Sequence, residues 1–215
     1  MEISHPPIPK QKKGAQSNTI SRVQHDSLSE ACVHYAVVKG RLFDVNNWGE
    51  ISNNLAEFKL ADPVGNLKDG IPEKGDLIRI NLPAPGTETS GDYEWVRIEY
   101  ILIKKSIMAD NESAAIIVRP AENPETKDGQ TAHFFKEDAT STFIVERRST
   151  TISAEVHGRN ENPNTSVNSL YDKLRNLIVS IGAILGFSKV QWKSFVNGLI
   201  QLEHENTINL KNQTD

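Results

Sequence analysis

The sequence has a single cysteine, no excess of basic residues and no long apolar run, and each absence excludes a class of protein. Cys32 alone cannot form an internal disulfide or a cysteine-based metal site. The net charge is −4, from 24 Lys and Arg against 28 Asp and Glu, so no overall positive field attracts nucleic acid or an anionic membrane. No apolar run approaches bilayer length, and the first residues lack the apolar core of a signal peptide. We therefore expect a cytoplasmic protein that binds neither nucleic acid nor membrane.

Short motifs of known chemistry are also missing. The six histidines are scattered without the spacing of a zinc site, and there is neither a glycine-rich phosphate loop nor a nucleophile elbow. We therefore predict no metal and no cofactor. Whether the protein is an enzyme, and in which oligomeric state it exists, stays open at this point.

The strongest positive signal is a helical pattern near the carboxyl end. Between residues 166 and 185 the apolar residues recur at steps of three and four: Val167, Leu170, Leu174, Leu177, Ile178, Ile181, Ile184 and Leu185. This spacing predicts one apolar face on a helix of roughly 30 Å, long enough to cover a sheet. A second, shorter helix is predicted from Ser188 to Leu202 after a break at Gly186, with Ser188 and Gln191 as a capping box. Gly198 lies within this second helix, where a glycine lowers helix stability by about 1 kcal/mol relative to alanine. We therefore expect that it marks a position of close packing.

Upstream of these helices the sequence predicts mainly strands. Residues 31–38 alternate as a strand that is apolar on nearly both faces, and residues 41–53 suit one or two short helical turns. Further strands are predicted around 56–60, 78–82, 95–103, 114–118, 142–148 and 150–157, the last two as a hairpin. Short turns between them imply antiparallel neighbours. In the longest strand Val96, Ile98, Tyr100 and Leu102 are expected on one face, and charges such as Arg147 are expected at the surface.

The composition divides the chain into three parts. Residues 1–30 are rich in Pro, Lys, Ser, Gln and Asn, so we expect a mobile N-terminal arm with a small basic cluster at Lys10, Lys12 and Lys13. Residues 31–202 are expected to form a single α+β domain, and residues 203–215 a polar tail. The predicted fold is a curved antiparallel sheet that grips a long C-terminal helix, followed by a second short C-terminal helix.

Two stretches carry a resemblance to a known superfamily. Residues 43–52, FDVNNWGEIS, look like the short-helix segment after the first strand, and residues 74–80, KGDLIRI, look like a strand that starts after a glycine. With the order of elements, they resemble the START-like, or polyketide cyclase and Bet v 1-like, superfamily, whose helix-grip fold wraps a sheet around a long helix. The resemblance implies an apolar cavity between sheet and helix for a small hydrophobic or aromatic molecule. A fully packed core is the alternative.

The densest polar cluster ends the last predicted strand and comprises Glu155, His157, Arg159, Asn160 and Glu161. Strand alternation places Glu155 and His157 on one face, where the carboxylate can orient the imidazole for acid-base catalysis. An exposed, solvated strand face is the alternative. Arg159 has a planar guanidinium that can hold a ligand carboxylate or bridge to Glu161.

The ligand-binding candidates are aromatic and basic side chains expected around the cavity: Tyr100, His133, Phe135, Phe143 and Arg159. Three functions remain open from the sequence. The first is binding of a small hydrophobic ligand, and the second is a cyclase- or hydrolase-type enzyme that uses Glu155 and His157 in the same cavity. The third is a structural protein that docks a partner through its C-terminal helices.

Overall fold

The computed structural model describes residues 8–54, 56–81, 93–106, 110–124, 137–162 and 184–202, with the side chains of the last range described from residue 190 onward. Its elements in chain order are β1 (Ala15–Gln24), α1 (Leu28–Phe43), η1 (Val45–Asn47), α2 (Trp48–Ile51), β2 (Glu57–Ala61), β3 (Leu77–Asn81), β4 (Glu94–Ser106), β5 (Asn111–Pro120), β6 (Thr140–Arg148), β7 (Thr151–Glu161) and α4 (Ile184–Leu199). The long helix predicted from 166 to 185 lies almost entirely outside the described residues. The predicted polar tail, residues 203–215, lies outside them as well.

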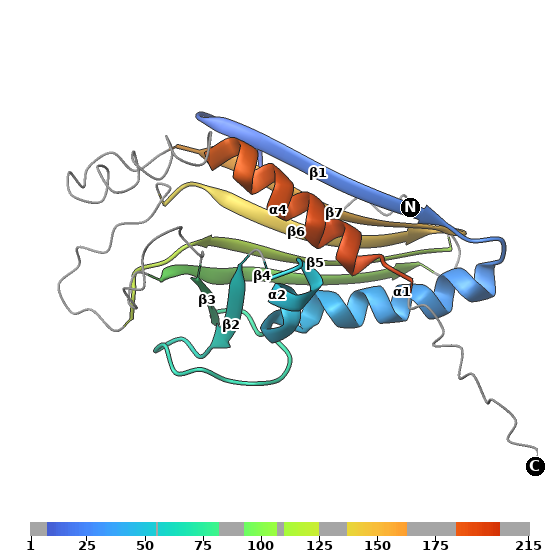
Figure 1. Ribbon diagram of the computed structural model, residues 1–215, viewed down its shortest axis with the longest axis horizontal. Helices are drawn as coiled ribbons and strands as arrows, with labels where there is room; N and C mark the ends of the chain where they lie inside the picture. The colour runs from blue at the N-terminus through green and yellow to red at the C-terminus, as the bar shows by residue number, and fades with distance from the viewer. Residues whose placement is uncertain are drawn as a thin grey trace, which may run out of the picture.

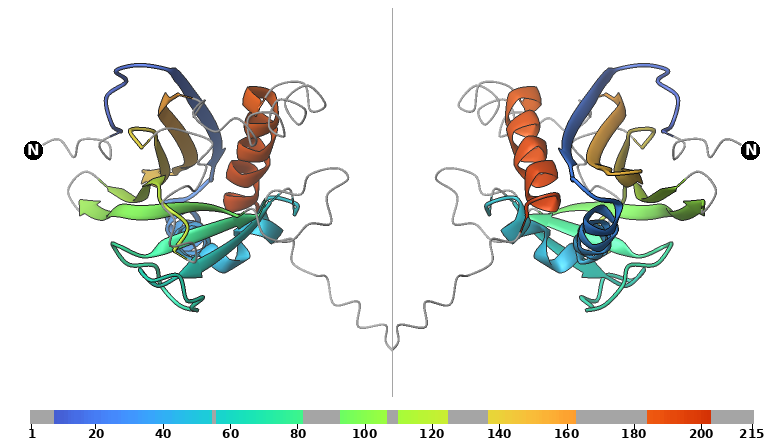
Figure 2. Two further views of the ribbon diagram at one scale, coloured as in Figure 1. Left: turned by 90° about the vertical axis from the view of Figure 1, so that its left-hand side faces the viewer. Right: turned by 90° about the vertical axis from the view of Figure 1, so that its right-hand side faces the viewer.

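The described strands form one antiparallel sheet of seven strands in the order β1-β7-β6-β5-β4-β3-β2. From β2 to β7 each strand pairs with the next in the chain, as the short turns predict, and β1 pairs with the last strand, β7. Figure 1 shows α4 crossing the β1–β7 part of the sheet. In the views of Figure 2 the sheet is bent, with β1 and β7 set steeply against β4. The α+β class and the antiparallel sheet are therefore confirmed.

Residues 28–43 form the helix α1, so the strand predicted at residues 31–38 is wrong. The helix begins at Ser27, whose Oγ accepts a hydrogen bond from the backbone N–H of Glu30 at 3.2 Å. Its buried residues follow the helical period: Ala31, His34, Tyr35, Val38 and Leu42. Val33, which gives the strand-like alternation, is 67% exposed. The alternation is therefore accidental, and the cap together with the three-and-four spacing decides the local structure.

The strand β1 occupies part of the predicted mobile arm, so that prediction is wrong for residues 15–24. It pairs with β7 from Ala15 opposite Glu161 to Gln24 opposite Thr151. Its side chains are mostly polar and mostly not buried, because an edge strand is held by backbone hydrogen bonds to one neighbour and needs few apolar contacts. An apolar pattern therefore does not reveal it in the sequence.

The helix α4 runs from Ile184 through Gly186 without interruption, so the break and capping box predicted there are wrong. A glycine inside a helix costs only about 1 kcal/mol, which neighbouring packing can offset. The close packing predicted at Gly198 is confirmed, since a Cβ there would overlap the carbonyl oxygen of Ile51 in α2. Arg41 of α1 donates through Nη1 to the carbonyls of Leu199 at 3.0 Å and Gln201 at 2.6 Å. This charge-assisted cap ties the end of α4 to α1.

The three helices α1, α2 and α4 share one apolar core with one face of the sheet, which we call the helix face. Phe195, Val196 and Leu199 of α4 are fully buried in this core. The apolar face of α4 is therefore occupied within the chain, where the docking hypothesis would place a partner. Within the described residues, no helix combines the length and the apolar character needed to cross a bilayer.

Candidate functional site

An apolar row crosses four strands on the helix face. Val156 of β7 lies opposite Phe143 of β6, Phe143 opposite Ile116 of β5, and Ile116 opposite Ile101 of β4. The first three side chains are buried, whereas Ile101 is only partly buried. In the next row, Ile103 of β4 is 62% exposed. Because α4 packs chiefly on β1 and β7, the β4 end of this apolar surface is the less covered end.

Aromatic rings gather where α4 crosses the row. Among the described residues they are Trp48, Phe58, Phe143, Trp192 and Phe195. The centroid of the Phe143 ring lies 4.8 Å from that of Trp48 and 5.5 Å from that of Trp192. The first contact is tilted and the second is edge-on, which are geometries that aromatic pairs favour. Trp48 is fully buried, and its Nε1 donates to the carbonyl of Leu42 at 3.1 Å. Trp192 is only partly buried and forms the accessible edge of the cluster.

A carboxyl group lies on the same face at the end of β7, as the result of a β-bulge. The register between β1 and β7 shifts between Ala15 and Ser17, which puts one extra residue in β7, and Asn160 takes a left-handed φ of 55°. The extra residue returns Glu161 to the face of Gly158. Because Gly158 has no side chain, the carboxyl of Glu161 occupies that space: a Cβ on Gly158 would overlap Oε1 of Glu161 and lie 2.5 Å from Oγ of Ser17.

The carboxyl of Glu161 is buried and incompletely hydrogen-bonded. Ser17 Oγ donates to its Oε1 at 3.3 Å, while its Oε2 is buried with no hydrogen-bond partner. Burial raises the pKa of Glu161 above its ordinary value, against the smaller opposing effects of Ser17 and Arg159. The carboxyl is therefore shifted toward its neutral form.

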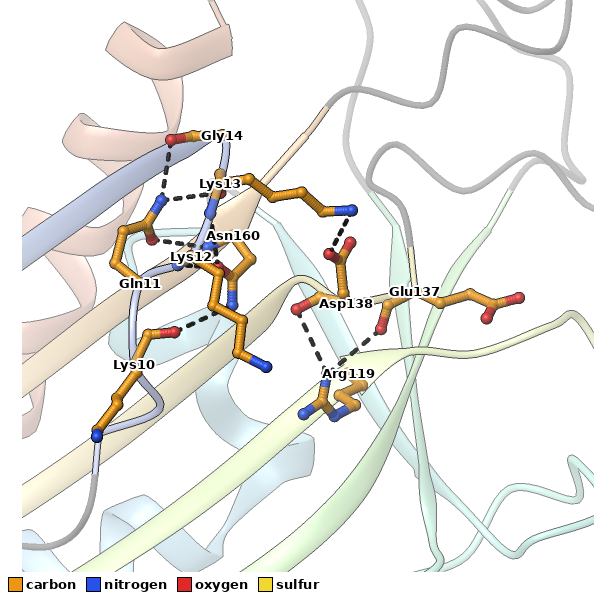
Figure 3. Close-up of polar contacts among 9 residues, drawn as sticks. All are labelled: Lys10, Gln11, Lys12, Lys13, Gly14, Arg119, Glu137, Asp138 and Asn160. Atoms are coloured by element: carbon orange, nitrogen blue, oxygen red, sulfur yellow. Dashed lines mark hydrogen bonds and ion pairs between the residues drawn. The ribbon is translucent and has the colours of Figure 1, made fainter.

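The bulge is held from outside by residues 11–13 of the predicted arm (Figure 3). Asn160 Oδ1 accepts hydrogen bonds from the backbone N–H groups of Lys12 at 2.7 Å and Lys13 at 3.3 Å. The backbone N–H of Asn160 donates to Gln11 Oε1 at 2.9 Å. The ammonium of Lys13 lies 3.0 Å from Oδ2 of Asp138. These contacts fix the left-handed residue, and with it the position of Glu161.

The predicted Glu155 and His157 pair lies on the other face of the sheet, which we call the outer face. Glu155 Oε2 is 2.8 Å from His157 Nε2, and His157 Nδ1 is 2.7 Å from Asn18 Oδ1 of β1. Arg159 Nη2 donates to the same Asn18 oxygen at 2.8 Å, so this oxygen is an acceptor and His157 Nδ1 carries a hydrogen. A hydrogen bond between His157 Nε2 and Glu155 Oε2 then requires one hydrogen between these two atoms.

The carboxylate–imidazole contact is present, but its surroundings differ from both expectations. Glu155 and His157 are 4% and 5% exposed, so a solvated strand face is wrong. They alternate with Ala154 and Val156, which belong to the core shared with α4. The pair therefore points away from the space between sheet and helix, which the cyclase or hydrolase hypothesis requires it to face.

A second bulge moves Tyr100 to the outer face. The register of β4 against β5 shifts between Ile98 and Tyr100, so the side chains beyond Ile98 change faces. The prediction that Tyr100 and Leu102 share a face with Ile98 is therefore wrong. Tyr100 is 52% exposed, and the ammonium of Lys74 lies 5.0 Å from its ring centroid. Its position excludes it from a site on the helix face.

Of the ligand-binding candidates, Phe143 alone among the described ones lies on the helix face. Arg159 lies on the outer face, one residue before the bulge, and cannot hold a ligand carboxylate beside α4. His133 and Phe135 lie outside the described residues. Glu161 belongs to the polar cluster noted in the sequence, but strand alternation alone puts it on the wrong face. The one local sequence signal of the bulge is Gly158 followed by Arg159 and Asn160, directly before Glu161.

An open depression of about 350 Å³ lies beside α4, between its last turns, β1 and α2. Its lining is about as polar as it is apolar and includes Ser21, Asn53, Ser194 and Asn197, with Ser21 Oγ 2.7 Å from Asn197 Oδ1. It is not the apolar cavity that the resemblance implies. His, Cys, Asp and Glu side chains of the described ranges nowhere gather in a group of three that can hold a metal ion.

No protein-family model and no curated protein matches the chain. Among solved structures it is similar to the major latex-like protein 151 of Panax ginseng, at 15% identity over 78% of this chain and 96% of that chain, with a TM-score of 0.39. Ara h 8.0201 matches at 9% identity over 84% and 98% with a TM-score of 0.30, and a Staphylococcus epidermidis protein at 14% over 90% and 96% with a TM-score of 0.36. Bet v 1-like proteins, which the sequence resembles, are thus among these matches. With TM-scores below 0.5, they carry no information on a ligand.

Proposed function

We propose that this protein binds a small hydrophobic or aromatic molecule on the helix face of the sheet, beside α4. The observation that carries the proposal is the apolar row that leads from the buried ring of Phe143 to the partly buried Ile101. The accessible edge of Trp192 lies over the buried end of this row. A flat apolar molecule can contact the indole on one side and the aliphatic strand residues on the other.

The affinity of a ligand at this site depends first on the apolar surface that it covers. Covering about 200 Å² of apolar surface contributes about 5 kcal/mol. That value corresponds to a dissociation constant on the order of 0.1 to 1 mM for a ligand without polar contacts. A tighter natural ligand therefore needs at least one further interaction.

The test uses N-phenyl-1-naphthylamine, an uncharged probe whose fluorescence rises in apolar surroundings. We expect saturable binding by the wild-type chain and a loss of at least tenfold in affinity for Ile101→Glu, because the new carboxylate must be desolvated under the probe. Leu102→Glu is the matched control, since the neighbouring residue is also partly buried but faces the other way. Equal effects of the two substitutions, or no saturable binding, would refute the proposed site.

A further inference from the structure

Four basic side chains gather on the outer face of the sheet, over β3, β4 and β5. The residue directly before each of Arg79, Arg97 and Arg119 packs in the core of the helix face, so strand alternation turns these three arginines outward. The ammonium of Lys74 reaches the same face, where it lies 5.0 Å from the ring centroid of Tyr100. The outer face of these strands therefore carries a group of cations, although the net charge of the chain is −4.

The three arginines form a short row across neighbouring strands. Arg97 of β4 lies directly opposite Arg119 of β5, and such opposite residues have their Cβ atoms about 4.5 to 5.5 Å apart. Arg79 of β3 lies opposite Trp95, two residues before Arg97, so it is the diagonal neighbour of Arg97 at about 7 to 8 Å. Like charges that face each other across a ladder destabilise the sheet, so this row needs compensation.

No carboxylate provides that compensation within the described part of the chain. None of the four cations belongs to an ion pair there, and Glu99, the carboxylate nearest to Arg97 in the chain, belongs to none either. Arg97 is exposed. Arg119 Nη1 makes long hydrogen bonds of 3.4 Å to the carbonyls of Glu137 and Asp138 (Figure 3). An anion that bridges the guanidiniums of Arg97 and Arg119 would offset the repulsion between them.

We infer that Arg97 and Arg119 together bind a phosphoryl group of a phosphorylated small molecule, and that Arg79 binds a second phosphoryl group next to it. Each guanidinium is a planar fork that matches two oxygens of a phosphate. A tetrahedral phosphate has oxygens for both forks, whereas a carboxylate has two oxygens, which one guanidinium occupies. The inference does not depend on the proposed function, because the apolar row lies on the opposite face of the sheet.

Arg79 is held in place for this role by an aromatic ring. Its guanidinium carbon lies 4.2 Å from the ring centroid of Tyr93, which is a stabilising cation–π contact. A guanidinium that stacks on a ring keeps its N–H groups free in its own plane. Arg79 can therefore donate to an anion beside Arg97 while it stays on Tyr93.

The experiment titrates the full chain with sodium phosphate, pyrophosphate or acetate at constant ionic strength and follows the ¹H–¹⁵N NMR signals, including the arginine Nε–H groups. We expect saturable shifts with pyrophosphate and phosphate, and pyrophosphate should bind about tenfold more tightly because it engages one more guanidinium. Acetate should bind more weakly than phosphate. Added NaCl should weaken all three, because the site is exposed and salt screens it.

Three variants assign the binding to the row. Arg97→Gln should lower the affinity for phosphate and pyrophosphate about tenfold, while the free energy of unfolding does not fall, because a like-charge pair is removed. Arg79→Gln should lower the affinity for pyrophosphate and leave that for phosphate unchanged. The matched control is Arg22→Gln, at an exposed arginine of β1 opposite Ser153, and it should leave both affinities unchanged.

Arg97→Lys separates the planar fork from the charge. It keeps the cation but makes a single-point contact, so we expect severalfold weaker phosphate binding by a folded chain, whereas wild-type affinity in this variant would refute the role of the fork. The inference also fails if pyrophosphate gives no saturable shifts, or if acetate binds as tightly as phosphate. Equal losses in Arg97→Gln and Arg22→Gln would show a response to total charge and would overturn it as well.

Discussion

Replacing Gly198 by alanine should force α4 away from α2. A Cβ at this position would overlap the carbonyl oxygen of Ile51 and would lie 2.8 Å from its Cγ2 and 2.9 Å from its carbonyl carbon. Because the main obstacle is backbone, it cannot rotate away, and overpacking of this kind costs about 1 to 3 kcal/mol. Alanine regains about 1 kcal/mol of helix propensity. At the upper end of the packing cost, we expect a net loss of about 2 kcal/mol, which lowers Tm by about 4 to 8 °C for a chain of this size.

The same substitution in another helix provides the control. Gly40 lies on the exposed side of α1, and a Cβ there would meet no atom within 4 Å, so Gly40→Ala should stabilise by about 0.5 to 1 kcal/mol. Thermal and urea unfolding followed by circular dichroism measures both variants. If Gly198→Ala raises Tm as Gly40→Ala does, then α4 does not pack on α2 and the helix face described here is wrong.

Three further predictions concern charged and titratable groups. Arg147 is buried, with its Nη2 2.8 Å from Glu112 Oε1, so the surface position expected for it is wrong, and Arg147→Met should lower the free energy of unfolding by about 3 kcal/mol. Lys105→Met removes an exposed cation from the same carboxylate and should lower it by less than about 1 kcal/mol. Equal losses in urea unfolding would contradict the burial of the Arg147–Glu112 ion pair. Burial lowers the pKa of His34 below 6.5, so its contribution to the free energy of unfolding is present above that pH and is lost as the pH falls through the lowered value. His34→Gln should therefore make the free energy of unfolding less dependent on pH in this range. An unchanged dependence would contradict the assignment to His34. Burial raises the pKa of Glu161 above 4.5, so the native state keeps a proton that the unfolded chain releases. The free energy of unfolding therefore falls as the pH rises above 4.5 through the raised pKa. Glu161→Gln should remove this fall, which urea unfolding at a series of pH values can check.

The part of the fold that follows from side-chain alternation was predictable. The strands from β2 to β7 have apolar residues at period two or, as in β5, a short continuous apolar run. The short connections from β4 to β5 and from β6 to β7 imply antiparallel neighbours. The strand β1 is an edge strand without an apolar pattern, so its pairing with β7 depends on backbone groups that the sequence does not distinguish. The helix α1 had a signal in the sequence, the capping box of Ser27 and Glu30, but the alternation of Val33, Tyr35 and Val37 competes with it.

The candidate site was predictable only as far as the strands are regular. Alternation correctly places Glu155 beside His157, and Phe143 on the face of Val145. It fails for Tyr100 and Glu161, each of which follows a bulge. A bulge adds one residue to the strand, so every side chain beyond it lies on the face opposite to the one that strict alternation predicts.

Both bulges lie at the ends of a single row of the sheet. Ile98 lies opposite Val118, Val118 opposite Ser141 and Ser141 opposite Gly158, and the extra residues follow Ile98 in β4 and Gly158 in β7. A bulge bends its strand and increases the local twist, so two of them in one row bend the sheet along a line across it, consistent with the steep angle between β7 and β4 in Figure 2. The same two insertions turn Tyr100 outward and Glu161 inward. The bend of the sheet and the faces taken by Tyr100 and Glu161 therefore have one structural cause.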